Sequence, residues 1–320
     1  MTPETGWLPH ASRHLGAAKG WTVIFSAELL VQTVLSGLMV GVLYALMALG
    51  ITFIYSIVKT INWAMGEFYM IGSYIQFVAV HYLLGARWWW LAAIISAAGT
   101  FLVGLILEPI LIKPMYARPM QRRDDYATVV TIALLLLLRS LAVALGGPNQ
   151  YRPESDLPVV WIGPLPQEGA RVAAFVCALL ALAVFWIVIK RTWVGLALRA
   201  AAQNRVAVQT SGVDVYRLDA IAFAIGVALA GLAGALLAPL FMVFPTNGAV
   251  TTVKGFEIIV IGGLGSIPGA LVGGLLLGLA ESLGAAFISS PYQNVYGFLL
   301  VIVVLIVRPD GLFGERGREA

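Results

Sequence analysis

Long apolar stretches alternate with short polar ones along most of the chain. A helix needs about 20 apolar residues to cross the roughly 30 Å hydrocarbon core of a bilayer. Stretches that approach or exceed this length cover residues 33–56, 68–84, 88–112, 126–145, 172–189, 219–240 and 294–307. The pattern therefore predicts an all-α polytopic membrane protein.

One apolar region, residues 253–282, is interrupted near its centre by Gly262, Gly263, Gly265 and Pro268. Glycine and proline both disfavour a continuous helix. Backbone left unpaired at membrane depth must face protein or a water-filled cavity. We therefore expect a broken or re-entrant helical hairpin with its break inside the protein, in addition to about eight transmembrane helices.

Composition supports a lipid environment, because 60% of the 320 residues are hydrophobic and 11% are charged. A soluble chain carries roughly a quarter of its residues as charges. The net charge of +4 is explained by basic cytoplasmic loops and does not indicate nucleic acid. The single cysteine, Cys177, lies in an apolar run and is interpreted as a small buried hydrophobe.

Basic residues orient the predicted spans. They gather in 113–123, 190–217 and 308–318, which the positive-inside rule assigns to the cytoplasm, while the partly acidic stretch 146–169 forms the main external loop. The broken hairpin must then re-enter or cross twice. The same parity places the N-terminus outside despite Arg13 and Lys19, unless a further crossing is hidden in 21–56.

A second glycine-interrupted site, INWAMGEFYMIGSY at 61–74, precedes a span as the GGLGSIPG break does. Matching breaks in the two halves of a chain point to a solute pathway built from discontinuous helices, although glycine is also common in ordinary membrane helices. The candidate pathway residues are Asn62, Glu67, Gly263 and Gly265. A charge at mid-membrane costs about 2.5 to 3.5 kcal/mol even on lenient scales, so Glu67 is expected to face a cavity, a partner or an interface.

Two further features concern packing and charge within the spans. Glycine pairs at four-residue spacing, such as Gly37 with Gly41 and Gly274 with Gly278, predict close helix contacts. Arg139 either extends toward the membrane surface or pairs with Glu257 or Glu281.

Motifs for catalysis and for metal or cofactor binding are missing. The sequence contains no GxxxxGK[ST] loop for ATP, no HExxH or GxSxG, and no histidines at metal-ligand spacing. We therefore expect a protein that is not an enzyme and that holds neither a metal nor a cofactor.

The stretch 190–217 is too polar to span the membrane, yet residues 196–209 favour a helix that ends at Gly212. It is either a solvated loop or a short helix that docks in a groove of a cytoplasmic partner. In the docked case, Ala201 and Ala202 supply small contact residues, and Arg199 and Arg205 would meet an acidic or carbonyl-rich rim.

Four segments in this order and spacing resemble the permease subunits of branched-chain amino acid ABC importers. They are GLMVGVLYALMALGITFIYSIVKTINWAMGEFYMIGSY, RTWVGLALRAAAQNRVAVQTSGVDVYRLDAIAF, GGLGSIPGALVGGLLLGLAES and VRPDGLFG, and the similarity extends from about Val31 onward. The resemblance implies a multi-pass protein of the bacterial inner membrane that imports branched-chain amino acids, urea, amides or related small polar solutes. It also implies cytoplasmic ATP-binding subunits, a second homologous permease subunit and a periplasmic solute-binding protein as partners.

The resemblance further implies that 199–212 contains the helix that couples the chain to an ATPase, with Arg199, Ala201, Ala202, Asn204 and Gly212 as coupling residues. The family often has histidine or glutamine where this chain has Met65, which affects any inference about the solute.

The expected organisation is a polar extension and interfacial segment at 1–27, a transmembrane permease domain at 28–312 and a cytoplasmic tail at 313–320. The coupling region occupies 190–218 of the permease domain. One alternative is a proton-coupled secondary transporter that uses Glu67, Glu257 or Glu281. A channel or structural subunit has no specific feature in its favour.

Overall fold

The computed structural model describes residues 27–117, 122–163 and 165–314. The expected N-terminal extension, except Ala27, and most of the expected tail at 313–320 lie outside the described residues. The helices are α1 (Ala27–Val58), α2 (Met65–Val78), η2 (Ala79–Leu84), η3 (Ala86–Trp88), α3 (Trp89–Leu111), α4 (Lys113–Ala117), α5 (Arg123–Gly146), α6 (Gly169–Arg191), α7 (Trp193–Gln203), α8 (Arg205–Thr210), α9 (Val215–Leu237), α10 (Asn247–Gly262), α11 (Ile267–Phe287), η4 (Ser290–Tyr292) and α12 (Gln293–Val307). Two short antiparallel strands, β1 (Val160–Ile162) and β2 (Leu165–Gln167), pair with Val160 opposite Gln167.

Seven helical segments of the described chain are long and apolar enough to cross a membrane. This finding confirms the all-α polytopic fold, with seven candidate spans where the sequence predicted about eight. The helices α2 and α10, at 14 and 16 residues, are shorter. Because an α-helix rises about 1.5 Å per residue, neither covers the hydrocarbon thickness alone.

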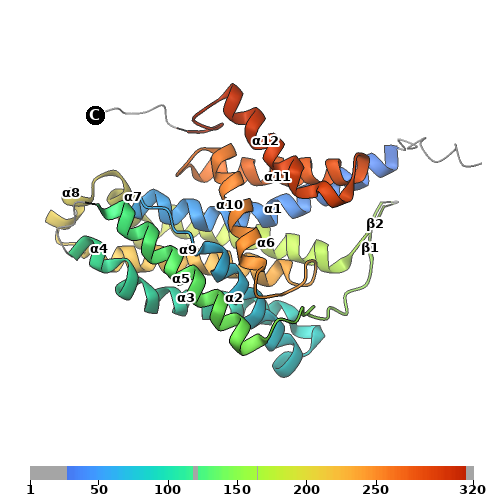
Figure 1. Cartoon of the computed structure of the whole chain (residues 1–320), viewed down its shortest axis with the longest axis horizontal. Coiled ribbons are helices and arrows are strands. Elements are labelled where there is room, and N and C mark those ends of the chain that lie inside the picture. The colour runs from blue at the N-terminus through green and yellow to red at the C-terminus, as the bar shows by residue number, and fades with distance from the viewer. Residues whose placement is uncertain (1–26, 118–121, 164, 315–320) are drawn as a thin grey trace, which may run out of the picture.

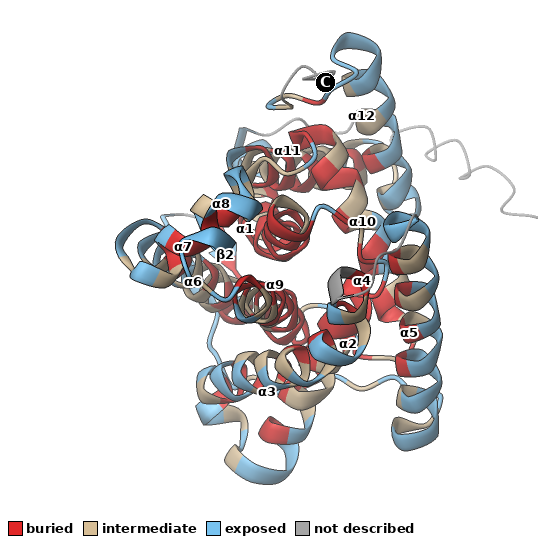
Figure 2. Cartoon of the chain, turned by 90° about the vertical axis from the view of Figure 1, so that its left-hand side faces the viewer, coloured by how far each residue is buried: buried red, intermediate tan, exposed pale blue. Residues whose placement is uncertain are grey.

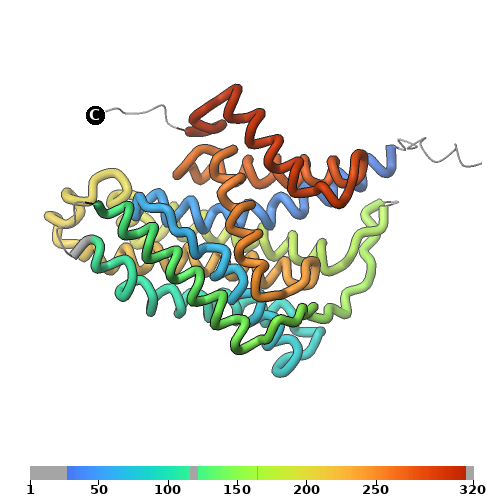
Figure 3. The backbone as a smooth tube through the Cα atoms, in the orientation of Figure 1, coloured from blue at the N-terminus to red at the C-terminus, as the bar shows by residue number. Residues whose placement is uncertain are grey.

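The helices lie roughly along one long axis (Figure 1). One end of the bundle carries α4, α7 and α8, and we call it the basic end because Lys113, Lys190, Arg191 and Arg199 lie there. The opposite end carries β1 and β2 and is called the strand end. Figure 3 shows α10 (orange) running steeply across the bundle, whereas α1 and α11 follow the long axis.

The centre of the bundle is formed by α1 and α9, each of which buries 72% of its most apolar stretch, against 11% for the segment that contains α12. Figure 2 shows this contrast, with buried residues on α1, α9 and α11 and exposed ones along α5 and α12. The outer helices expose large apolar side chains, including Leu145 (81%) and Ile306 (78%). A lipid environment accounts for that exposure, because water would oppose it.

Glycine pairs allow the central helices to approach closely, as the sequence predicted. A Cβ on Gly274 of α11 would lie 2.6 Å from the Cα of Ala45 in α1, and one on Gly278 would lie 2.5 Å from the Cα of Gly41. Small residues at such contacts let helices pack backbone to backbone in a membrane.

The predicted broken hairpin is present, because α10 ends at Gly262 and α11 begins at Ile267. The location of its break differs from the expectation. The backbone N–H groups of Leu312 and Phe313, near the end of the described chain, donate to the carbonyls of Ile261 and Gly262 at 2.9 Å each, and Leu264 is 49% exposed. The break therefore lies beside the C-terminal segment at the basic end. It comes there because it follows the last residue of α10, and α10 runs from the inside of the bundle to that end.

Two other non-helical segments, 59–64 and 238–246, enter the bundle. In 59–64, Thr60, Asn62 and Ala64 are buried, and the Trp63 ring packs against Phe256 of α10 with centroids 4.8 Å apart. In 238–246, Val243 is fully buried and exchanges two backbone hydrogen bonds with Tyr151, of 2.7 and 2.8 Å. The structural counterpart of the first glycine-interrupted site is therefore the segment 238–246 that precedes α10, and not GGLGSIPG.

Candidate functional site

The first turns of α2 and α10 lie against each other inside the bundle. The backbone N–H of Gly66 donates to Oγ1 of Thr252 at 3.1 Å, and a Cβ on Gly66 would overlap the carbonyl oxygen of Gly248. Glycine is required at both positions, since a Cβ on Gly248 would lie 2.8 Å from Oε2 of Glu67. Two discontinuous helices thus present their N-termini to one place, which is the arrangement that transporters use for solute and ion sites.

Glu67, in the first turn of α2, is fully buried between these two N-termini. Neither of its carboxylate oxygens has a hydrogen-bond partner among the described residues. The residues at the cap positions, Ala64 and Thr246, do not cap their helices with their own side chains. Burial opposes a negative charge at this point, whereas the positive ends of two helix dipoles favour it.

Two asparagines beside Glu67 also hold unpartnered groups. Asn62 accepts a hydrogen bond from the N–H of Ala64 at 2.9 Å, but its Nδ2 has no partner within the described structure. Asn247 donates to Oγ of Ser73 at 3.3 Å, but its Oδ1 has none. An unsatisfied buried polar group costs about 1 to 3 kcal/mol, so several of them together point to water or a passing solute.

The four predicted pathway residues do not form one site. Asn62 and Glu67 lie together at the start of α2, whereas Gly263 lies against Gly314 and Gly265 lies beside Tyr55. Gly263 follows the last residue of α10, and the contact with α2 is made at Gly248 and Thr252, so about 17 to 22 Å of helix separates the two places. The structure thus places the two glycines in the break at the basic end.

A second buried polar cluster connects α1, α10, α11 and α12. Lys254 forms an ion pair with Glu281, which also accepts hydrogen bonds from the Tyr44 hydroxyl and the Gln293 amide, both at 3.1 Å. The Lys254 ammonium also lies 5.1 Å from the centre of the Tyr44 ring. Glu281 therefore pairs with Lys254. One of our two interpretations of Arg139 had instead paired that arginine with Glu257 or Glu281. The sequence feature that could have indicated this ion pair is one opposite charge in each arm of the predicted hairpin, Lys254 before the break and Glu281 after it.

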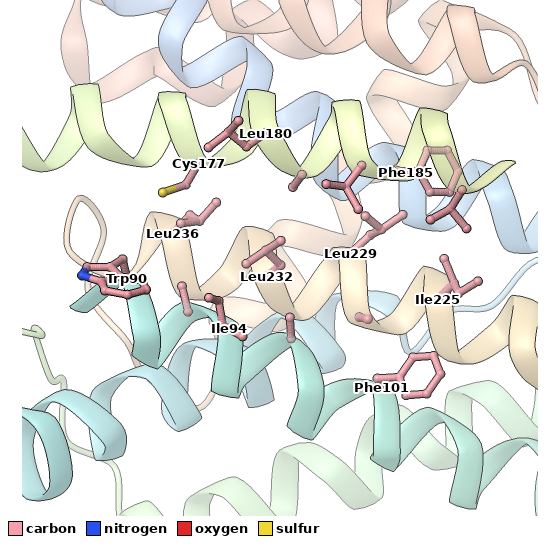
Figure 4. A pocket seen from close by; sticks show the side chains of 16 residues that line it. Trp90, Ile94, Phe101, Cys177, Leu180, Phe185, Ile225, Leu229, Leu232 and Leu236 are labelled. Atoms are coloured by element: carbon pink, nitrogen blue, oxygen red, sulfur yellow. The ribbon is translucent and has the colours of Figure 1, made fainter. Parts of the chain in front are cut away.

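The largest apolar hollows lie on the outside of the bundle. One of about 530 Å³ lies between α3, α6 and α9 and is lined by Trp90, Phe101, Cys177, Leu229 and other apolar side chains (Figure 4). A polar solute would lose its hydration there without finding hydrogen bonds. This hollow suits lipid chains and is not a candidate solute site.

The stretch 190–217 forms two helices at the basic end (Figure 1). Thr192 caps α7 by accepting the N–H of Gly195 at 3.1 Å, and Asn204 caps α8 by accepting the N–H of Ala207 at 3.0 Å. Gly212 follows α8 with a φ of 84°, which favours glycine. The expected helix and its stop are present, but the helix is broken at Asn204. The sequence did not predict this break, because the alanines around it favour a continuous helix.

The side chains of α7 divide between two faces. Leu198 and Ala201 are buried, whereas Arg199 is exposed and Ala202 is half-buried. Ala201 is therefore not available as a contact residue for a partner. Large apolar side chains instead occupy the exposed face, and a groove of about 390 Å³ lies between α7 and α8. The exposed side chains are Trp193 (67%) and Leu196 (56%) on α7 and Val206 (69%) on α8, which sequence reasoning missed.

Arg205 ties α8 to the bundle. Its guanidinium makes a two-pronged ion pair with Asp219 in the first turns of α9, with Nη1 donating to Oδ1 at 3.0 Å. Asp219 is 1% exposed. The expected contact of Arg205 with the rim of a partner is thus replaced by a bond within the chain. This pair joins the α7–α8 segment to the central helix of the bundle.

Apolar spans around a buried polar site, where two discontinuous helices begin, define the protein as a membrane permease. The chain belongs to the family described as branched-chain amino acid transport system / permease component, whose model matches residues 33–307.

Curated relatives agree with this assignment. The chain is 33% identical over 297 residues to the high-affinity branched-chain amino acid transport system permease protein LivH of Escherichia coli (strain K12), covering 89% of this chain and 95% of the relative. The same values hold for BraD of Pseudomonas aeruginosa. The permease protein LivM of Salmonella typhimurium is 27% identical over 311 residues, covering 84% of this chain and 67% of the relative. No solved structure matches the chain.

Proposed function

We propose that this chain is the transmembrane permease subunit of an ABC importer that carries branched-chain amino acids or chemically similar small solutes into the cell. The observation that carries the proposal is similarity over 89% of the chain to permeases of branched-chain amino acid transport systems. The proposed location is the inner membrane of a bacterium. The basic end faces the cytoplasm, because its loops hold the lysines and arginines.

The importer contains cytoplasmic ATP-binding subunits, a periplasmic solute-binding protein and a second, homologous permease subunit. The second permease is supported by the similarity of this chain to two differently named permeases, LivH and LivM. The ATP-binding subunits are separate chains in this proposal, because the sequence lacks the phosphate-binding loop that ATP hydrolysis of this type requires.

The ATP-binding subunit docks on the α7–α8 segment in this proposal. The support is an exposed apolar face, Trp193, Leu196 and Val206, with Arg199 and Asn204 also exposed, on a part of the chain that lies outside the predicted spans. Motion of the docked segment reaches α9 through the Arg205–Asp219 ion pair. Because α9 contacts α2 at Gly72 and Gly231, that motion extends to the helix that carries Glu67.

Co-purification of the ATP-binding subunit with the permease tests the docking. We expect Leu196→Glu, Arg199→Glu and Ala202→Glu to lower both the recovery of the ATP-binding subunit and coupled uptake, while membrane insertion continues because no span changes. Val159→Glu is the matched control, because Val159 is equally exposed (57%, against 56% for Leu196) in the segment between α5 and α6. Unchanged recovery and coupled uptake for all three variants would return the segment to a solvated loop.

The runner-up function is proton-coupled secondary transport, which the buried, unpartnered carboxylate of Glu67 favours. The two functions differ in their energy source. In vesicles that contain the whole complex, uptake should require ATP and stop when the ATP-binding subunit is made inactive. Uptake driven by a pH gradient without ATP would support the secondary transporter.

A further inference from the structure

A small pocket opens next to the two polar clusters, between α1, α2, α10 and the segment 238–246. Its volume is about 130 Å³. It is lined by Tyr44, Met47, Tyr69, Leu237, Phe241, Met242, Phe244, Asn247, Val250, Thr251 and Lys254. The pocket therefore joins the start of α10, beside Glu67, to the Lys254–Glu281 ion pair.

Most of the pocket wall is apolar, and part of it is open. Met47 and Leu237 are buried in its floor, whereas Phe241 (41% exposed), Met242 (51%) and Val250 (47%) form its rim. An apolar cavity of about 150 Å³ is known to take up benzene, so a pocket of this volume matches one small solute and not a peptide. Methionine and phenylalanine side chains adapt to aliphatic groups of slightly different shape.

Two polar groups on the wall offer complementary contacts. Lys254 is 14% exposed at its side chain, and its ammonium has three donors, of which the bond to Glu281 uses one. Asn247 is 6% exposed, and its Oδ1 is a buried acceptor without a partner among the described residues. One donor of positive charge and one neutral acceptor lie about two turns apart on the same helix.

We propose that this pocket binds one zwitterionic amino acid with an aliphatic side chain on its way through the permease. The carboxylate of the solute meets the Lys254 ammonium, its ammonium meets Oδ1 of Asn247, and its side chain contacts Met47, Leu237 and the rim. This inference rests on the proposed import function and adds the place and the residues within this subunit.

The charges that line the pocket fit a solute without net charge, because Lys254 is the only charged residue among the lining residues and Glu281 balances it. Glu281 is already occupied by Lys254, Tyr44 and Gln293. Glu257 faces α12, since a Cβ on Gly297 would lie 2.7 Å from its Oε2, and it does not line the pocket. A solute anion or cation would leave one of the two polar contacts unused, whereas a zwitterion uses both.

Filling the pocket is the first test, in vesicles with the whole importer and leucine as the solute. Val250→Trp places a large ring at the rim and should lower uptake about tenfold or more, by steric exclusion of the solute. Val253→Trp is the matched control, because Val253 is equally exposed on the same helix (44% against 47%) but does not line the pocket. We expect the control to keep wild-type uptake.

The outcomes separate this inference from the proposed function. Absence of ATP-driven leucine uptake by the wild-type complex overturns the function on which the inference rests. Wild-type uptake together with equal effects of the two tryptophan variants overturns the pocket and leaves the function standing.

Enlarging and labelling the pocket provide two further measurements. Met47→Ala should raise the ratio of phenylalanine to leucine uptake, and this ratio is independent of how much protein folds. A leucine analogue that carries a diazirine should, on illumination during transport, label α10 or the segment 238–246, and excess leucine should prevent the labelling. An unchanged ratio, or competed label confined to other helices, would show that the solute does not use this pocket.

Discussion

Glycine interrupts the apolar helices of this chain at two places that look alike in sequence and differ in the structure. At residues 263–266 many of the groups that the break frees are engaged. The N–H of Gly263 bonds to Ile259, Ser266 caps α11 by accepting the N–H of Gly269 at 3.1 Å, and the C-terminal segment bonds to Ile261 and Gly262. This break is a completed turn between two helices.

At the start of α2 the bonding is incomplete. The carboxylate of Glu67, Nδ2 of Asn62 and, on the facing helix, Oδ1 of Asn247 are buried without partners among the described residues. The cap residues of both helices, Ala64 and Thr246, make no side-chain cap bond. The comparison teaches that similar glycine breaks can differ in how far their polar groups are satisfied, and we expect the break with unsatisfied groups to be the one that meets the solute.

Gly66→Val should have the largest effect, because its Cβ would overlap the carbonyl of Gly248 and force α2 and α10 apart. Overpacking of this kind costs about 1 to 3 kcal/mol or more. We expect uptake to fall to background and the melting temperature of the purified protein to drop. Gly99→Ala is the control, since its Cβ would approach only the flexible end of Ile75 at 3.0 Å. Normal uptake by the Gly66 variant would mean that the α2–α10 contact is not needed for transport.

Glu67→Ala comes next. Removing the carboxylate takes away the charge that the two helix N-termini stabilise, so we expect uptake about tenfold lower with assembly intact. Initial uptake rates per assembled complex measure this. Glu67→Gln keeps the shape and removes the charge, and it should share the defect if the charge is what matters. Wild-type rates for both variants would make Glu67 a structural residue and remove the contrast between the two breaks.

Ser266→Ala should have the smallest effect and should act on stability alone. Loss of a helix N-cap costs about 1 kcal/mol. Thermal unfolding in detergent should show a small decrease in melting temperature, while uptake per folded molecule stays at the wild-type level because the capped break at 263–266 is not a solute site. A transport defect larger than the loss of folded protein would restore Gly263 and Gly265 as pathway candidates.

Much of the fold could be derived from the sequence, because span length, glycine breaks and loop charge are local properties. Apolar runs identified six of the seven candidate spans, and the seventh, α11, was expected as an arm of the broken hairpin. The run at 68–84 was also expected to span, but it is not among the seven. The stop at Gly212 and the break before Ile267 were visible from their glycine and proline residues. Asn62 and Glu67 were also identified in this way, since polar residues beside a break at membrane depth are conspicuous in a chain so apolar.

Tertiary structure alone decided which interruptions lie inside the bundle and which charges meet. The segment 238–246 carries no charge to mark it, and its role depends on α10 starting against α2. The rotation of each helix about its own axis decides which side chains meet and which are buried. It brings together Lys254 with Glu281 and Arg205 with Asp219, and it buries Ala201. Hydrophobicity places a helix in the membrane but does not specify its rotation, because lipid and protein neighbours are equally apolar. The close fit of the glycine-lined contacts determines that rotation.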